Sequence, residues 1–314
     1  MIRTCFLLLI SLAGIQASWA QRPSTLDASA LDFYLIQAFQ ARTSTERLPL
    51  NHIGVQVQES VSGYLVTAVL EGYPAHDAGI NRGDIIESVD DQSYHPVYSF
   101  NEPELAAEEF GADSLEHELV VRRGQNRMVL SLLPVFENLY DSYRTATLNS
   151  IQEFSVGNKV IGYIRLWGLS RNSNDLLSLS NIIAQLDHCD GLIIDLRNSF
   201  GYLDLQHLDL VFTDRSRYFD MAGASGSLTS LASSIGSNID DPYRKPIAVL
   251  VNADTRGGPE LFAYQLNKLG RVTTLGTASA GQLGDYRMES TDSTPVLHYQ
   301  PANELLIDAL PFEG

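Results

Sequence analysis

Apolar positions recur along the chain with two different periods, and the change of period divides the chain. Between residues 25 and 48 they follow helical spacing, and Ser29 with Asp32 three residues later predicts a capped, amphipathic helix. We therefore expect residues 21–49 to form an N-terminal helical segment. The apolar positions that set this spacing are Leu31, Tyr34, Leu35, Ala38 and Phe39.

Residues 50–134 contain short apolar runs separated by glycine turns, which predicts a small β-rich domain. We expect a single helix late in this domain, over residues 102–110. The predicted strands cover residues 54–58, 64–70, 84–89, 119–121 and 128–132.

From about residue 135, buried strands alternate with helices. This alternation favours an α/β domain over residues 135–314, with a mostly parallel sheet that is covered on both faces. Residues 222–241 are rich in Gly, Ser and Asp and predict a long surface loop. The predicted strands cover 160–166, 191–196, 246–251 and 271–275, and the predicted helices cover 174–187, 202–212 and 259–269.

The first twenty residues have the layout of a secretory signal. Arg3 gives a positive start, residues 6–12 are apolar, and a small–x–small ending reaches Ala20. Polar and glycine positions interrupt the apolar run, which disfavours an uncleaved membrane anchor because such an anchor needs about 20 apolar residues. We predict cleavage of residues 1–20 and a periplasmic or extracellular location.

The charge and the cysteine content narrow the possible partners. Acidic residues outnumber basic ones 38 to 21, giving a net charge of −17. Such a chain repels nucleic-acid phosphates and anionic membrane surfaces, so we expect no nucleic-acid binding and no anchoring on such a membrane. After residue 20 no segment is apolar enough to span a bilayer, so we expect no membrane embedding. Signal cleavage leaves Cys189, which we expect to be a small buried residue at a strand start. The histidines are scattered and no cysteines are paired, so we expect no metal site and no cofactor.

Residues 73–86, which read YPAHDAGINRGDII, resemble the signature of bacterial PDZ domains. Pro74 and Ala75 suit a helix start, Gly79 a helix end, and Gly83 with Asp84 a turn into a strand. The resemblance covers residues 50–134 and implies a domain that binds extended peptides by strand addition.

The PDZ resemblance also implies the position of a peptide groove. A ligand carboxylate would meet the backbone N–H groups of Ile53, Gly54 and Val55, and the receiving strand would continue from Gln56. Leu105, on the predicted helix over residues 102–110, would line the opposite wall. A PDZ fold that is kept for packing, without a free groove, remains the alternative.

The strands over 160–166, 191–196 and 246–251 resemble the core of the C-terminal processing (tail-specific) serine peptidases, family S41. In that family the second of these strands runs into an Asn-Pro-Gly-Gly turn that helps to form the oxyanion hole. Here the turn reads Ser199-Phe200-Gly201-Tyr202, and Gly201 matches the first glycine. The resemblance extends from residue 50 to the end of the chain.

Catalysis in this family uses a serine–lysine dyad, in which a neutral lysine takes the proton of the serine. The helix that begins near Glu260 fixes the register of the nucleophile at Gly257. The family lysine follows about 25 residues later, at Gln282. The resemblance therefore implies a member without its dyad. Thr255 and Ser279 are the nearby hydroxyls that could stand in for the missing serine.

The sequence thus predicts an exported, PDZ-containing peptidase homologue that binds peptide C-termini or a protein partner without cleaving it. An active serine-type endopeptidase with displaced catalytic groups is the first alternative. A scaffold that works through its surface is the second. The helix within residues 25–48 could also mediate a homodimer.

Overall fold

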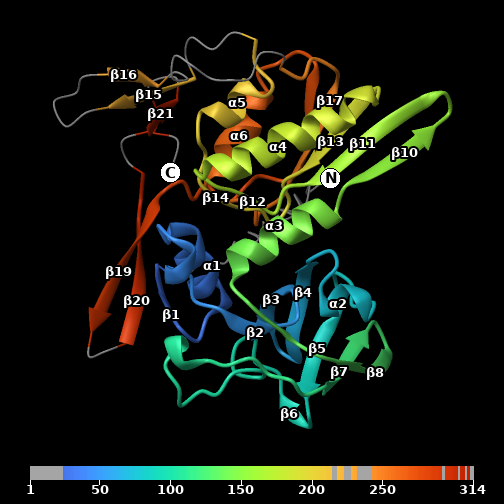
Figure 1. The fold of residues 1–314 in the computed structure, drawn as a ribbon, viewed down its shortest axis with the longest axis vertical. Coiled ribbons are helices and arrows are strands. Elements are labelled where there is room, and N and C mark those ends of the chain that lie inside the picture. The colour runs from blue at the N-terminus through green and yellow to red at the C-terminus, as the bar shows by residue number, and fades with distance from the viewer. Residues whose placement is uncertain are drawn as a thin grey trace, which may run out of the picture.

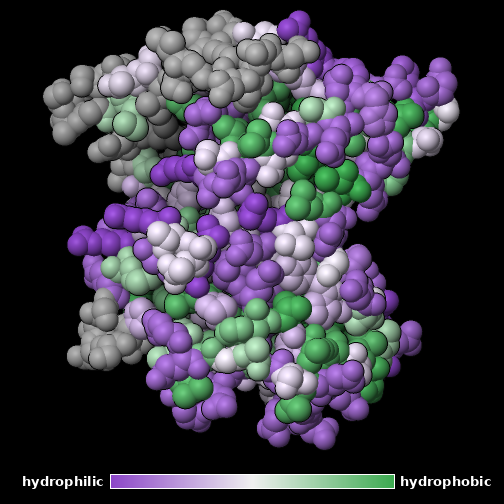
Figure 2. Space-filling model, viewed as in Figure 1, coloured by the Kyte–Doolittle hydropathy of each residue, from purple (hydrophilic) through white to green (hydrophobic). Residues whose placement is uncertain are grey.

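Two lobes are stacked along the long axis of the computed structural model, with the N-terminal helix and the C-terminal strands beside their junction (Figure 1). In a space-filling view the surface is indented on the right between the lobes, and we call this level of the molecule the waist (Figure 2). The structure describes residues 24–213, 218–222, 228–231, 242–291, 294–302, 305–307 and 310–311. The predicted signal over residues 1–20 and most of the loop over residues 222–241 lie outside these ranges.

The β-rich lobe is a six-stranded antiparallel sheet, ordered β3-β4-β5-β7-β8 with β6 beside β5. All five strands predicted between residues 50 and 134 are present. Their inward side chains, such as Val66, Ile86 and Leu119, form one buried cluster. Because β3 pairs only with β4, one of its edges is unpaired within the sheet. The elements are β3 (Val55–Ser60), β4 (Gly63–Val69), α2 (Pro74–Asp77), β5 (Ile85–Val89), β6 (Gln92–Ser93), η2 (Ala107–Glu109), β7 (His117–Arg123) and β8 (Asn126–Leu132).

The prediction of a helix over residues 102–110 is wrong. Only the short 3₁₀ turn η2 forms there. Glu104 and Glu108 would repel each other at helical i,i+4 spacing, and Ala107 and Phe110 instead pack into a buried apolar cluster.

The α/β lobe has a five-stranded sheet, ordered β10-β11-β13-β17-β18. The pairs β11–β13, β13–β17 and β17–β18 are parallel, and β10 adds an antiparallel edge. Helices α4 and α6 pack apolar side chains, among them Ile182 and Phe262, into the same core as the sheet. The elements are β10 (Gln152–Val156), β11 (Lys159–Arg165), β12 (Gly168–Leu169), α4 (Ser173–Gln185), η3 (Leu186–His188), β13 (Gly191–Asp195), β14 (Phe200–Gly201), α5 (Gln206–Asp209), β17 (Ile247–Val251), α6 (Gly258–Leu266) and β18 (Val272–Gly276).

The helix predicted over residues 202–212 is shortened to the four residues of α5. Its first turn is missing because the preceding backbone continues the contact between β12 and β14. The Tyr202 N–H donates to the Leu169 carbonyl over 2.8 Å instead of entering a helix.

A second apolar cluster fills the waist and joins the N-terminal segment to both lobes. Phe33 and Ile36 of α1 are fully buried there, together with Trp167 and Leu297. Because the apolar side of α1 packs inside the chain, it is not available for the predicted homodimer. The waist elements are β1 (Thr25–Asp27), α1 (Leu31–Gln40), η1 (Ser44–Glu46), β2 (Leu50–His52), β9 (Val135–Glu137) and α3 (Leu139–Asn149).

The start of α1 differs from the prediction in its cap. The N-cap is Ala30, which makes no side-chain cap. The N–H and hydroxyl of Ser29 donate to the Asp27 carboxylate instead, so Ser29 closes a local turn before the helix. The predicted boundary at residue 49 does not separate an independent unit, since α1 belongs to the waist core.

Late strands complete the molecule. β20 pairs with both β19 and the N-terminal β1, and β15, β16, β21 and β22 form a separate small sheet. Within the described residues, no helix combines the length and apolar character needed to cross a membrane. The bounds are β15 (Phe219–Ala222), β16 (Leu228–Leu231), β19 (Asp285–Thr291), β20 (Thr294–Gln300), β21 (Leu305–Ile307) and β22 (Leu310–Pro311).

Candidate functional site

The turn between β17 and α6 carries Gly257, the predicted nucleophile position. Gly257 is the N-cap of α6, with φ 71° and ψ −133°, in a sharp strand-to-helix turn. A Cβ atom built on Gly257 would lie 2.5 Å from the carbonyl oxygen of Gly201. The structure therefore brings the predicted nucleophile and oxyanion-turn positions into direct contact, and the vector of a side chain at 257 points at that turn.

The oxyanion-turn position is confined by its own neighbours. Gly201 has φ 135°, and a Cβ atom there would lie 2.0 Å from the carbonyl oxygen of Leu169. Asn198 also has positive φ, at 62°. The Arg256 N–H donates to the Ser199 carbonyl over 3.0 Å, which fastens this turn to the residue before Gly257. The two turns thus form one rigid backbone unit.

Glu260, one turn into α6, joins this unit to the predicted lysine position. Its buried carboxylate accepts N–H groups from Gly257 at 2.9 Å, Gly281 at 2.6 Å and Gln282 at 2.9 Å. Burial raises the pKa of Glu260, although hydrogen bonds from the Ser279 hydroxyl and these amides oppose the shift. The carboxylate therefore holds three backbone segments together at one point.

No general base occupies the lysine position. The Gln282 backbone lies beside Gly257 through their shared partner Glu260, but its side chain is an amide, which cannot take up a proton at physiological pH. The Gln282 side-chain oxygen is buried and has no hydrogen-bond partner among the described residues. The predicted register thus places Gly257 and Gln282 together, and neither supplies a reactive group.

The two candidate substitute hydroxyls have different surroundings. Thr255 is fully buried, and its hydroxyl donates to the Leu196 carbonyl at 2.8 Å and accepts from the Asn252 N–H at 3.0 Å. The Thr255 hydroxyl therefore stabilises the turn through these two hydrogen bonds. Ser279 is exposed and its hydroxyl bonds to Glu260.

A groove of about 490 Å³ runs between the free edge of β3 and the segment before Gly257. Val55 and Gln56 line it, followed by Val57 and Gln58 along the same strand. The opposite wall comes from α1 and from the loop before α6. Its other lining residues include Leu31, Asp32, Leu35, Tyr64, His95, Pro96, Asp254 and Arg256.

Leu105 does not line this groove. It lies with Phe110 in a separate pocket, because residues 102–110 do not form the helix that was predicted to face β3. Ile53 is 1% exposed and belongs to the core of the β-rich lobe, so only its backbone could face a ligand.

The predicted carboxylate loop is tied to a buried histidine. His52 lies on β2 with 3% exposure, where its Nδ1 accepts the Gly54 N–H at 3.1 Å and its Nε2 lies 3.1 Å from the Ser142 hydroxyl. Burial lowers the pKa of His52 to about 4, so the ring is neutral at physiological pH. Gly54 therefore has its amide already engaged.

Two contacts connect the groove to the turns, and sequence reasoning missed both. The Gln56 amide donates to the Asn198 carbonyl at 3.0 Å and to the Tyr143 hydroxyl at 2.6 Å. Arg256 is buried and forms a two-pronged ion pair with Asp32 of α1, at 2.6 and 3.0 Å. In the sequence, the one indication of this ion pair is an arginine between a predicted buried strand and a predicted helix. Its partner Asp32 is more than 200 residues away, so the pair could not be predicted.

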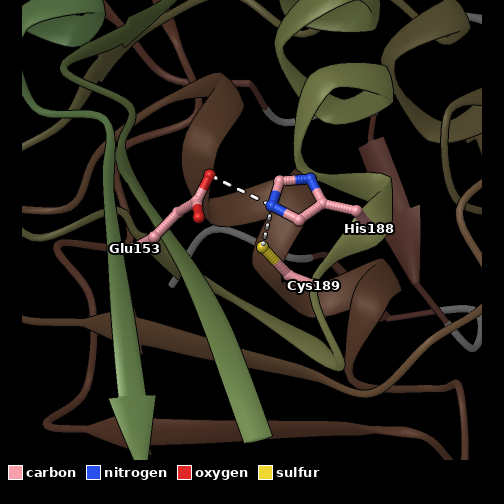
Figure 3. Close-up of side chains that lie close together, drawn as sticks. All are labelled: Glu153, His188 and Cys189. Carbon is pink, nitrogen blue, oxygen red and sulfur yellow. Dashed lines mark hydrogen bonds and ion pairs between the residues drawn. The ribbon is translucent and has the colours of Figure 1, made fainter.

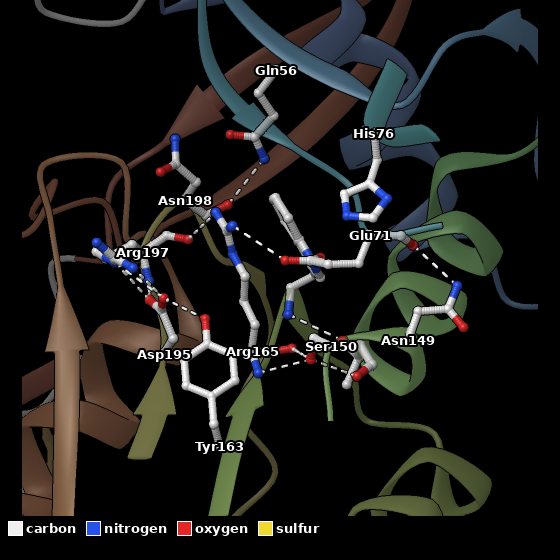
Figure 4. Close-up of polar contacts among 12 residues, drawn as sticks. Gln56, Glu71, His76, Asn149, Ser150, Tyr163, Arg165, Asp195, Arg197 and Asn198 are labelled. Atoms are coloured by element: carbon white, nitrogen blue, oxygen red, sulfur yellow. Dashed lines mark hydrogen bonds and ion pairs between the residues drawn. The ribbon is translucent and has the colours of Figure 1, made fainter. Parts of the chain in front are cut away.

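A polar network lies beside the turns that carry Gly201 and Gly257, at the ends of β11 and β13 (Figure 4). Arg165 lies over the Trp167 ring at 3.7 Å, and both side chains contact Glu71 of the β-rich lobe. Burial opposes ionisation of Asp195, but hydrogen bonds from Arg197 outweigh it and hold the pKa of Asp195 below its ordinary value. This network fixes one lobe against the other next to the candidate site.

Comparison with known proteins agrees with this arrangement. Residues 160–304 match the model of peptidase family S41. The carboxyl-terminal-processing protease of Synechocystis sp. is 25% identical over 253 residues, which cover 76% of this chain and 54% of the relative. The chloroplastic carboxyl-terminal-processing peptidase 2 of Arabidopsis thaliana is 22% identical over 223 residues, covering 70% and 42%. The chain thus spans about half the length of these relatives.

A solved structure shares the fold. The putative S41 protease of Bacteroides fragilis superposes with a TM-score of 0.53 at 17% identity, covering 82% of this chain and 72% of that one. The matched residues 160–304 include Gly201, Gly257 and Gln282. Residues 160–304 are therefore similar to the S41 peptidase family, and the fold of the chain is shared with a member of that family.

Proposed function

We propose that this chain, homologous to the S41 peptidases over residues 160–304, is an exported PDZ-containing member that binds polypeptide C-termini without cleaving them. The observation that carries the proposal is Gly257. Its backbone turn directs a side chain at the oxyanion-turn position Gly201, yet it has no side chain to direct.

Peptide hydrolysis by the family mechanism needs an attacking oxygen and a base that takes its proton. Gly257 offers no attacking atom and Gln282 accepts no proton. Glu260 is the nearest acid to both, but its oxygens already bond three backbone amides. Preorganised backbone donors could still hold a carbonyl group near Gly201, and on their own they cannot replace a nucleophile.

Peptide binding by strand addition needs chiefly a free strand edge and a groove beside it. The free edge of β3 faces the 490 Å³ groove, whose walls combine apolar side chains with Arg256. The PDZ-like signature over residues 73–86 lies in the same lobe. Since the Gly54 amide already donates to His52, the loop over residues 53–55 has one donor fewer for a ligand carboxylate.

The binding proposal is tested with paired peptides that end in a free carboxylate or in an amide. Charge-assisted hydrogen bonds contribute about 1.5–3 kcal/mol, so the acid should bind roughly 10- to 150-fold more tightly by calorimetry. A charged substitution on β3, Val57→Glu, should weaken binding, whereas Val129→Glu on the far edge strand β8 should not. Equal affinity for acid and amide would reject C-terminus recognition.

The absence of cleavage is tested by prolonged incubation with unfolded protein substrates and mass spectrometry. We expect no cleavage. A second candidate function, an endopeptidase with a displaced nucleophile, is favoured by one observation: Ser279 is exposed and its hydroxyl bonds to Glu260. Cleavage that disappears in Ser279→Ala but persists in Ser178→Ala, an exposed hydroxyl on α4, would establish that alternative.

The export proposal rests on the composition of residues 1–20 and has its own test. The mature protein from its native compartment should begin at Gln21 by N-terminal sequencing. A mature chain that begins at Met1 would reject signal cleavage.

A further inference from the structure

Three possible metal ligands meet at a corner of the α/β lobe, away from the groove. Glu153 projects from β10, His188 ends η3, and Cys189 follows it (Figure 3). Their ligand atoms all lie within 4.8 Å of one another. The Glu153 carboxylate lies 3.2 Å from His188 Nε2, and the Cys189 sulfur lies 3.7 Å from the same nitrogen. The carboxylate and the thiol therefore converge on one imidazole atom.

The other ring nitrogen of His188 has a partner of its own. Nδ1 lies 2.9 Å from the Gln185 carbonyl oxygen, which can only accept, so Nδ1 carries a proton. In the neutral ring Nε2 is then an acceptor with its lone pair facing the Glu153 carboxylate, another acceptor. Two facing acceptors require a cation between them, either a proton on Nε2 or a metal ion. A histidine that donates one N–H to a backbone carbonyl is also the arrangement that orients metal-bound imidazoles.

Two of the three ligand separations fit tetrahedral coordination, and the third, from the Glu153 carboxylate to the Cys189 sulfur, is no more than 4.8 Å. Bonds of about 2.0–2.1 Å to nitrogen, 2.0–2.2 Å to oxygen and 2.3 Å to sulfur place tetrahedral ligands about 3.4 Å (N to O) and 3.6 Å (N to S) apart. The separations in the structure are 3.2 and 3.7 Å. A zinc-sized ion could bind all three groups with only small side-chain movements.

We propose that Glu153, His188 and Cys189 form a site for a borderline-soft divalent cation of the Zn²⁺ class. Thiolate and imidazole ligands favour such ions over Mg²⁺ and Ca²⁺. On binding, the Cys189 S–H bond breaks, a metal–sulfur bond forms and the proton leaves to solvent. The side chains of Glu153 and His188 are 48% and 58% exposed, so a fourth position is open to water.

The charges around the site are compatible with a dication. Lys159 pairs with Asp190 at 2.7 Å and Lys245 pairs with Asp187 at 3.6 Å, so the neighbouring charges largely cancel. When His188 is neutral, as it is when its Nε2 binds a metal, the uncompensated groups are Glu153 and, once deprotonated, Cys189. Burial and the Glu153 charge raise the pKa of Cys189, so the thiol is protonated until a metal displaces its proton.

From the sequence we expected no metal site, because no recognised ligand spacing is present. His188 and Cys189 are adjacent, and Glu153 is 35 residues earlier. Glu153 reaches them because β10 pairs with β11, and β11 pairs in turn with β13, which starts two residues after Cys189. A bound ion would tie the solvent-exposed edge strand β10 to this corner of the sheet.

The test uses the full reduced chain carrying Cys5→Ser, which leaves Cys189 as its one thiol. Titration with Co²⁺ should give a sulfur-to-cobalt charge-transfer band at one ion per chain, together with the visible bands of tetrahedral cobalt. Zn²⁺ should displace both. Glu153→Gln and His188→Gln alter half-exposed side chains and should each weaken Co²⁺ binding at least about tenfold. Cys189→Ser should abolish the charge-transfer band.

The matched control is Glu289→Gln, which alters a surface carboxylate beside His298, at 3.8 Å, with no thiol nearby. It should leave cobalt binding unchanged. Failure of a saturable charge-transfer band to form would reject the site. A band that depends on Cys189 but is unchanged in Glu153→Gln and His188→Gln would also reject it, since the thiol alone would then be binding. If Cys189→Ser fails to fold, the two half-exposed variants decide the question.

Discussion

β3, which lines the groove, and the Gly201–Gly257 unit, which adjoins the groove-lining Arg256, differ in what they require of their side chains. In the proposed binding mode β3 meets a peptide with backbone groups, so many sequences along Val55–Ser60 would serve. The Gly201–Gly257 unit could act by the family mechanism only with a particular side chain at position 257. The chain has the backbone of both regions, with glycine at 257 and an amide at 282. Under our proposal, binding would therefore occur in this fold without catalysis.

Positive-φ glycines in the molecule differ in how closely other backbone atoms approach them. In the β-rich lobe, Gly79 and Gly83 have positive φ, but a Cβ atom there would meet nothing within 4 Å. In the candidate site, Gly201 and Gly257 combine positive φ with backbone atoms at 2.0 and 2.5 Å. Only the second pair is fixed by its neighbours as well as by its own conformation.

The largest expected effect is that of Gly201→Ala. The new methyl group would overlap the Leu169 carbonyl, a backbone atom that cannot turn aside, and we expect the free energy of unfolding to fall by about 3–5 kcal/mol. Gly83→Ala, with positive φ and open space, should lower it by about 1–2 kcal/mol. Urea unfolding measures both. Equal losses would mean that the oxyanion-turn position is not confined by Leu169.

The second prediction concerns His52, which links the predicted carboxylate loop to α3. Its pKa is about 4 in the folded protein and near the ordinary 6.5 when unfolded, so the unfolded chain binds its proton more readily. The stability that neutral His52 contributes is complete above pH 6.5 and is lost as the pH falls from there towards 4. The total loss is about 3 kcal/mol.

Unfolding free energies of wild type and His52→Gln between pH 7 and 4 check this. The wild type should lose about 3 kcal/mol more than the variant over this range. The subtraction removes the contribution of groups common to both proteins, such as His117. Burial opposes protonation of His117, but the hydrogen bonds that its ring donates to the Asp90 and Asp113 carboxylates outweigh burial and raise its pKa. Parallel pH profiles would show that His52 does not stay neutral inside the fold.

The third prediction tests whether the nucleophile position can be refilled. In Gly257→Ser the new Cβ would approach the Gly201 carbonyl to 2.5 Å, so we expect about 2–3 kcal/mol of destabilisation and no hydrolysis without a base at 282. Gly79→Ser has similar φ, +77° against +71°, and open space. It should destabilise by about 1–2 kcal/mol. Hydrolysis by Gly257→Ser alone would reveal a base that this structure does not place there.

Sequence patterns predicted most strands of both lobes because their periods depend on local burial. Residues 191–195, almost all apolar, could only be a buried central strand. The position of Gly257 followed from Glu260 and its helix, and that of Gln282 from the family spacing of about 25 residues. In the structure the Glu260 carboxylate accepts the N–H groups of both. The patterns failed where distant partners decide the structure. Helix α3 was not predicted, since its mean composition is polar and its buried side is set by α1.

The groove also shows that local sequence patterns do not predict contacts between distant segments. Its second wall was assigned to residues 102–110 by resemblance, whereas the chain supplies α1 and the residues before α6. No local signal in residues 25–48 indicates that they face β3. The ion pair of Asp32 with Arg256 and the approach of Glu153 to Cys189 are likewise long-range contacts.

The smallest expected effect tests the direct links from β3 to the Asn198 turn and to α3. Gln56 is partly exposed on β3, and its amide donates to the Asn198 carbonyl and the Tyr143 hydroxyl. Gln56→Ala removes both bonds, and we expect the free energy of unfolding to fall by about 1 kcal/mol. Gln58→Ala, two residues along the same strand and more exposed, should change it by less than about 0.5 kcal/mol. In a double-mutant cycle, Gln56→Ala with Tyr143→Phe should show a coupling of about 0.5 kcal/mol or more, because the two residues share one bond. Additive losses would mean that the bond between Gln56 and Tyr143 contributes no measurable energy, and that β3 is not coupled to α3 through it.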